Sequence, residues 1–172
     1  MHADNAIRMG WVLNLVRKRK NRLHTLHSQE SIVMTLDLTS LRRAVNSLER
    51  AIQVAAKEIQ GSVDNDYEEV IRAGVIQNFE FTYELCWKFM KRWLEVNGEG
   101  PSVDGATRKE LFRLAAERRL IDAVEVWFQY AGARNQTTHT YDNQKAADVF
   151  EAAKMFVKDA QSLLQRLENK ND

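Results

Sequence analysis

The scarcity of helix-breaking residues constrains the fold of this chain more than any other feature. Only one proline, Pro101, and seven glycines are spread over 172 residues. Proline and glycine are the residues that most often end helices and form turns. Apolar residues recur three and four positions apart along most of the chain, which is typical of amphipathic helices. We therefore expect an all-α fold in which long helices are joined by short turns.

The apolar periodicity predicts five helices, at residues 38–60, 67–96, 107–118, 121–134 and 144–168. Thr39 or Ser40 is expected to cap the first helix, and Asp142 or Asn143 the last. A glycine-containing turn at 98–105 separates the second helix from the third. Together these helices predict an up-and-down bundle of four to five antiparallel helices. The residues expected to face its core are Leu41, Ala44, Leu48, Ala51, Val54 and Ala55; Ile76, Phe79, Phe81, Tyr83, Leu85, Cys86, Met90, Trp93 and Leu94; Leu111, Leu114 and Ala115; Val124, Trp127, Phe128 and Ala131; and Ala147, Phe150, Ala153, Phe156, Val157, Ala160, Leu163 and Leu167.

The first 33 residues differ from the rest in charge. They contain six basic and two acidic residues, whereas the remaining residues contain 19 basic and 22 acidic ones. We interpret residues 1–33 as an N-terminal extension that is disordered or lies before the native start, because Met34 directly precedes a helix entry. A basic tail that binds RNA or a membrane surface is the alternative. Residues 34–172 are expected to form a single helical-bundle domain.

Several classes of function are disfavoured by composition. The body of the chain lacks the broad positive charge of a protein that binds nucleic acid over a large surface. No apolar run is long enough for a membrane helix, and a single cysteine, Cys86, suits the reducing cytoplasm. We expect Cys86 to pack in the core. No metal-ligand spacing or glycine-rich phosphate loop occurs, so we expect no metal, no cofactor and no nucleotidyltransferase activity in this chain.

Segment 134–141, R-N-Q-T-T-H-T-Y, holds the densest group of reactive side chains. His139 is the only histidine after residue 27. Histidine exchanges protons near neutral pH, and arginine binds phosphate through two donors. Arg134 and His139 are about 140° apart around a helix, so we expect them at a helix corner, with Asn135 capping the helix end. The segment predicts either a site for phosphodiester chemistry or a structural, hydrogen-bonded corner.

Two segments carry a family resemblance. R-N-Q-T-T-H resembles the arginine, four to six residues, histidine signature of the HEPN superfamily, and with Tyr141 it is similar to the form found in HepT-type toxins. Segment 76–88, I-Q-N-F-E-F-T-Y-E-L-C-W-K, resembles the central helix of nucleotidyltransferase substrate-binding proteins. The resemblance extends over residues 36–168, which is essentially the whole body.

The resemblance implies both a chemistry and a partner. HEPN toxins are metal-independent endoribonucleases that act as two-fold homodimers, which makes Arg134 and His139 the catalytic pair and RNA the substrate. A minimal nucleotidyltransferase acts as antitoxin and transfers AMP to the motif tyrosine, here Tyr141. The older name of the branch implies an alternative, a non-catalytic accessory subunit that presents a substrate to the nucleotidyltransferase. A dimeric interaction module with an inactive motif is a third hypothesis.

Further polar residues allow two interpretations each. Glu80 and Glu84 lie one turn apart on the expected central helix. Either one of them, with Glu84 the stronger candidate, orients Arg134 or His139, or both belong to a solvated face on which Glu84 pairs with Lys88. Trp87 and Trp127 are expected in the core rather than as platforms for RNA bases. A cluster of arginines either faces RNA or a partner, or is a solvated helix end: Arg113, Arg118 and Arg119.

Overall fold

The computed structural model describes residues 35–60, 64–139 and 142–171, and for His139 it describes the backbone only. The predictions made for residues 1–33 and for Tyr141 therefore lie outside the described residues.

Five helices of ten or more residues make up most of the described chain. They are α2 (Thr39–Glu58), α3 (Asn65–Leu94), α5 (Arg108–Glu117), α6 (Val124–Gln136) and α7 (Asn143–Asn169). Three shorter elements complete the order: the π-helical turn η1 (Glu95–Glu99), the short helix α4 (Gly100–Val103) and the 3-10 turn η2 (Thr137–His139). The described residues contain no strand, which confirms the all-α prediction.

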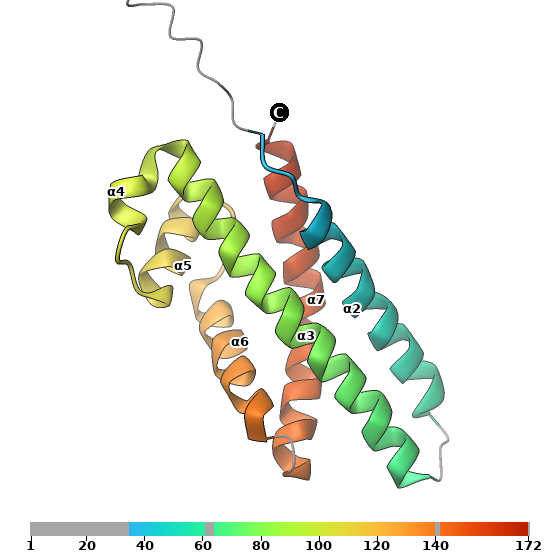
Figure 1. Ribbon diagram of the computed structural model, residues 1–172. Helices are drawn as coiled ribbons and strands as arrows, with labels where there is room; N and C mark the ends of the chain where they lie inside the picture. The colour runs from blue at the N-terminus through green and yellow to red at the C-terminus, as the bar shows by residue number, and fades with distance from the viewer. Residues whose placement is uncertain (1–34, 61–63, 140–141, 172) are drawn as a thin grey trace, which may run out of the picture. The chain divides into compact units, whose positions relative to one another are not determined.

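Helix α3 is the central element of the bundle. It packs against α2, α5, α6 and α7, while α7 also contacts α2 and α6. Figure 1 shows α3 crossing the front of the bundle, with α2 on one side of it, α6 on the other and α7 behind. Successive long helices of this group run in opposite directions, and α4 and α5 cover the far end of α3 (Figure 1). The fold is the predicted up-and-down bundle.

The core is built around a cluster of aromatic side chains from α3, α6 and α7. The ring of Phe156 on α7 lies 5.2 Å from Phe79, 5.7 Å from Trp127 and 5.1 Å from Tyr130, measured between ring centroids, with the planes near perpendicular. Edge-to-face contacts of this kind add to the free energy that burial of the rings supplies. Cys86 is fully buried as predicted, and burial raises the pKa of its thiol, so it packs as a neutral side chain.

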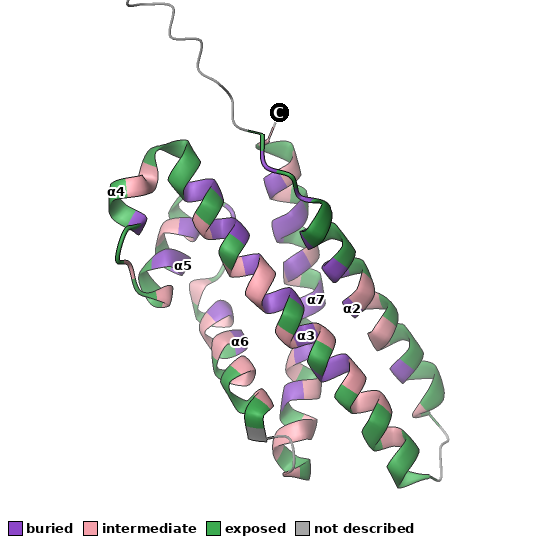
Figure 2. Cartoon of the chain, in the orientation of Figure 1, coloured by how far each residue is buried: buried purple, intermediate pink, exposed green. Residues whose placement is uncertain are grey.

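Two of the residues expected in the core are on the surface instead. Val54 is 52% exposed and Phe81 is 59% exposed, whereas every other residue expected to face the core is buried or half-buried. Phe81 follows the fully buried Phe79 by two positions, or about 200° around the helix. It therefore points to the side of α3 opposite Phe79, away from the core. Figure 2 shows buried and exposed residues alternating along α3.

The helix ends confirm one predicted cap and correct another. Asp142 caps α7 by accepting hydrogen bonds from the backbone N–H groups of Gln144 and Lys145. The predicted cap at Thr39 or Ser40 was wrong, because α2 begins at Thr39 and the carboxylate of Asp37 accepts the Thr39 N–H at 2.9 Å.

The segment between α3 and α5 is more helical than expected. Residues 98–105 were predicted to form a turn, but the chain passes through η1 into the short helix α4. Gly98 supplies the break with φ of 92°, a conformation that costs glycine little. Pro101 sits in the first turn of α4, where its missing N–H would have no helical partner.

Candidate functional site

The motif segment occupies the junction between α6 and α7, as the sequence predicts. Helix α6 continues through Asn135 and Gln136 to a C-cap at Thr137, so the prediction that Asn135 caps the helix was wrong. The hydroxyl of Thr137 donates to the carbonyl of Arg134 at 2.8 Å, and that of Thr138 donates to the carbonyl of Asn135 at 3.3 Å. These bonds compete with regular helical pairing and accompany the tighter turn η2.

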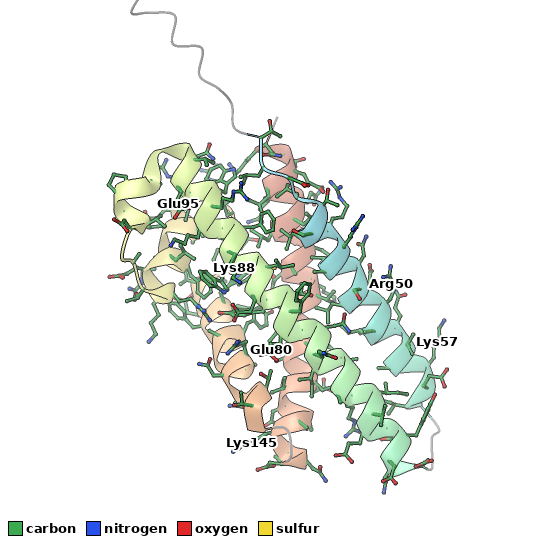
Figure 3. All side chains as sticks on the ribbon, viewed as in Figure 1. Arg50, Lys57, Glu80, Lys88, Glu95 and Lys145 are labelled. Atoms are coloured by element: carbon green, nitrogen blue, oxygen red, sulfur yellow. The ribbon has the colours of Figure 1, made fainter. Side chains whose placement is uncertain are left out.

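Arg134 lies against two carboxylates of α3. Its Nε atom is 2.9 Å from Oε1 of Glu84, and its Nη2 atom is 3.4 Å from Oε1 of Glu80. The Nε–H is not aligned for a hydrogen bond, so the Glu84 contact is an ion pair. Figure 3 labels Glu80 on the part of α3 that lies beside α6. The side chain of Arg134 is 30% exposed, which leaves part of the guanidinium open to solvent.

Glu84 is held from a second direction by Trp87. The indole Nε1 donates to Oε2 of Glu84 at 2.7 Å, while Oε1 faces Arg134. In the described chain no ion pair joins Glu84 to Lys88, so the structure favours the interpretation in which the glutamates contact Arg134. The consequence of this contact for activity stays a prediction.

Arg108 lies beside the network formed by Arg134, Glu80, Glu84 and Trp87. The sequence did not predict its position. It is the first residue of α5, and its guanidinium carbon lies 4.7 Å from the centroid of the Trp87 ring and 5.6 Å from that of Tyr83. Thr107 and Glu110 form a capping box that fixes the start of α5 and therefore the position of Arg108. The sequence signal for this start, a threonine followed three residues later by a glutamate, marks a helix entry but not what the next side chain contacts.

Negative charges outnumber positive charges around Arg134. Arg134 carries one positive charge between the two negative charges of Glu80 and Glu84. Arg108 forms no ion pair with any residue that the structure describes. Burial raises the pKa of the Tyr83 hydroxyl, and the nearby Arg108 charge offsets this only in part, so Tyr83 stays neutral at physiological pH.

The turn that carries His139 packs against α3, α6 and α7. The backbone of His139 is thus placed at the same corner as Arg134, while its side chain and all of Tyr141 lie outside the described residues. Within the described ranges, no group of three or more histidine, cysteine, aspartate or glutamate side chains is arranged to hold a metal ion. None of the helices in those ranges has the length and apolar character to cross a bilayer.

The other aromatic and basic candidates are separate from this network. Trp127 is 2% exposed and belongs to the core, as predicted, whereas Trp87 is only half-buried. Arg118 pairs with Glu99, and the guanidinium carbon of Arg113 lies 5.9 Å from the centroid of the Phe128 ring. These two arginines therefore contact Glu99 and Phe128 and do not join Arg134.

Comparison with known proteins agrees with this fold and motif. The family described as nucleotidyltransferase substrate binding protein like matches residues 36–169. The chain therefore belongs to this HepT-like family of nucleotidyltransferase substrate-binding proteins.

The chain covers nearly the full length of the individual relatives that it resembles. A Haemophilus influenzae protein named probable ribonuclease HepT is 34% identical over 138 residues, which are 79% of this chain and 94% of that protein. A solved H. influenzae structure, described as revealing the fold of a substrate binding domain of a nucleotidyltransferase, is 32% identical with a TM-score of 0.71, over 77% of this chain and 99% of the other. A solved Thermus thermophilus structure is 26% identical with a TM-score of 0.59, over 74% and 98% of the two chains.

Proposed function

We propose that this chain is the toxin of a two-component toxin–antitoxin module and acts as a metal-independent endoribonuclease. The observation that carries the proposal is the position of Arg134, which two glutamates of the central helix hold at the corner where His139 follows. The name of the H. influenzae relative, a probable ribonuclease, supports the same activity.

The proposed reaction uses the 2′-hydroxyl of the RNA as nucleophile. His139 removes the 2′ proton, the 2′ oxygen forms a bond to phosphorus, and the bond from phosphorus to the 5′ oxygen breaks. A second proton is delivered to the leaving 5′ oxygen, so the products are a 2′,3′-cyclic phosphate and a 5′-hydroxyl. Arg134 stabilises the charge that develops on the phosphorane oxygens.

A homodimer supplies the second proton donor. Each chain has one histidine after residue 27, and the reaction requires both a base and an acid. A two-fold axis that brings two motif corners together provides one histidine for each role. RNA then binds in a cleft between the two copies.

The partner in this proposal is a minimal nucleotidyltransferase that acts as antitoxin. The family description and the solved H. influenzae domain both connect this fold with a nucleotidyltransferase. The partner transfers AMP from ATP to the hydroxyl of Tyr141, which lies two positions after His139, and pyrophosphate leaves. A nucleotide attached there adds a bulky anion that occupies the cleft and competes for Arg134.

Expression of the chain alone tests the toxin hypothesis. Growth arrest is expected with the wild-type sequence and with Arg113→Ala, and normal growth with Arg134→Ala or His139→Ala. Co-expression with the nucleotidyltransferase is expected to restore growth and to add AMP to Tyr141, detectable by mass spectrometry. Arrest that persists in both site variants would contradict the proposal.

The second candidate function is a non-catalytic subunit that presents a substrate to the nucleotidyltransferase. The description of the solved H. influenzae domain as a substrate binding domain favours it. This function predicts normal growth, a stable complex with the nucleotidyltransferase and no RNA cleavage. A loss of nucleotidyltransferase activity when the chain is withheld would support it over the toxin hypothesis.

A further inference from the structure

The charge at Arg134 raises a problem for binding RNA. Two carboxylates approach the one guanidinium, so the group of three side chains has a net charge of −1. The glutamates fix the direction of Arg134, but they also repel a phosphate that approaches it. A site that binds successive phosphates on this face therefore needs further positive charge close by.

Arg108 is placed to supply that charge. Trp87, on which its guanidinium lies, follows Glu84 by three residues on α3, a rise of about 4.5 Å along the helix. The indole also donates to Glu84, so Arg108 and Arg134 are neighbours along one face of α3, joined through the Trp87–Glu84 pair.

The guanidinium of Arg108 lies over the ring of Trp87 and close to the hydroxyl of Tyr83. A guanidinium that lies over an aromatic face is held by its charge and its flat surface, while its N–H groups project from the edge. No carboxylate in the described chain pairs with this guanidinium, and the side chain is half-buried. A guanidinium that has no carboxylate partner and lies beside an ion-paired arginine is suited to a phosphate oxygen.

We propose that Arg108, stacked on Trp87, is a second phosphate-binding subsite that holds the RNA nucleotide next to the one at Arg134. This inference rests on the proposed ribonuclease function. Arg108 binds substrate and takes no part in proton transfer. The alternative is a purely structural role, in which Arg108 only stabilises the packing of the start of α5 against α3. In that case its removal changes stability and leaves the RNA contacts of the folded protein intact.

The binding of single-stranded RNA to the full-length protein tests the subsite. The probe is a fluorescent RNA with 2′-O-methyl groups, which cannot be cleaved through the 2′ oxygen, and binding is followed by anisotropy between 50 and 200 mM salt. Arg108→Ala is expected to weaken binding about tenfold and to reduce the dependence of log K on log salt by about 0.7, the contribution of one phosphate contact on a single strand. Arg108→Lys keeps the charge without the flat stacking surface and is expected to be intermediate.

Arg113→Ala is the matched control, because Arg113 is on the same helix and also lies over an aromatic ring, that of Phe128. It is expected to change RNA binding less than twofold. Circular dichroism of each variant shows whether it is folded. If Arg108→Ala does not fold, Arg108→Gln keeps the length of the side chain and is expected to show the same loss of affinity and of salt dependence.

Two results would overturn the inference in different ways. If the wild type cleaves RNA but Arg108→Ala and Arg113→Ala bind the probe alike, or the salt dependence of Arg108→Ala is unchanged, the subsite is wrong and the ribonuclease proposal stands. If the wild type neither binds the probe nor cleaves unmodified RNA, both proposals fail.

Discussion

Replacing Glu84 with glutamine removes one charge from the centre of the Arg134 network and leaves its shape almost unchanged. The side chains of Arg134 and Glu84 are 30% and 23% exposed, so this pair lies between the surface and the core. Surface pairs contribute less than about 1 kcal/mol, and breaking a buried pair costs roughly 3–5 kcal/mol. We therefore expect Glu84→Gln to lower the free energy of unfolding by about 1.5–2 kcal/mol.

Thermal unfolding followed by circular dichroism measures this effect. In a domain of this size, about 1 kcal/mol shifts Tm by roughly 3–5 °C, so the expected drop is about 5–10 °C. Glu80→Gln is the matched control, because its contact with Arg134 is longer, at 3.4 Å, and its side chain is 38% exposed. The control is expected to lower Tm by less than about 2 °C, in line with a surface pair.

A double-mutant cycle with Arg134→Ala isolates the ion pair. The glutamine can still accept the Trp87 indole N–H, so the coupling energy reports the charge contact alone. A coupling of about 1 kcal/mol or more is expected between Arg134 and Glu84. Equal Tm values for the two glutamine variants, or a coupling near zero, would refute the view that Glu84 is the main support of Arg134.

Three further predictions concern the bundle itself. Phe156→Ala removes the centre of the aromatic cluster and is expected to cost about 3–5 kcal/mol in chemical denaturation, whereas the exposed Phe81→Ala changes stability by less than about 0.5 kcal/mol. Thr107→Ala removes the side-chain cap of α5 and is expected to cost about 1 kcal/mol, with a smaller cost for Thr107→Ser. Burial and the hydrogen bond to Asp159 raise the pKa of Tyr130 above its ordinary value of 10.0, so the folded protein keeps this proton longer than the unfolded chain. The associated stability is complete below pH 10 and falls as the pH rises further, and Tyr130→Phe is expected to flatten this fall; an unchanged slope would contradict the assignment.

The fold was predictable because the sequence signals that define it are local and repeated. The stripe of apolar residues on α3, from Ile76 to Trp93, is buried as the helical period predicts. The prediction that Phe81 faces the core was wrong because a helical period gives the direction of a side chain but not how far the buried stripe extends around the helix. The role of Asp37 was missed because an aspartate can accept the N–H of the residue two positions later, and it thereby competes with Thr39 and Ser40 at the start of the helix.

The candidate site was predictable only in part. A contact of one of the two glutamates with Arg134 was one of two interpretations, whereas the structure brings both Glu80 and Glu84 to Arg134. The position of Arg108 was not anticipated, since it depends on where α5 begins and on how the chain returns to α3 after Gly98. Such placement depends on backbone geometry beyond a single helix, and periodicity does not encode it.

Analysis of RNA cleavage products shows whether the chain is a metal-independent ribonuclease that uses Arg134 and His139. Purified protein is incubated with a defined RNA in the presence of EDTA, and the ends of the fragments are identified by mass spectrometry. The proposed mechanism predicts 2′,3′-cyclic phosphates and 5′-hydroxyls, with the rate lowered at least about 100-fold by Arg134→Ala or His139→Ala and unchanged by Arg113→Ala. Cleavage that survives both substitutions, or a folded wild-type protein that leaves the RNA intact, would contradict it.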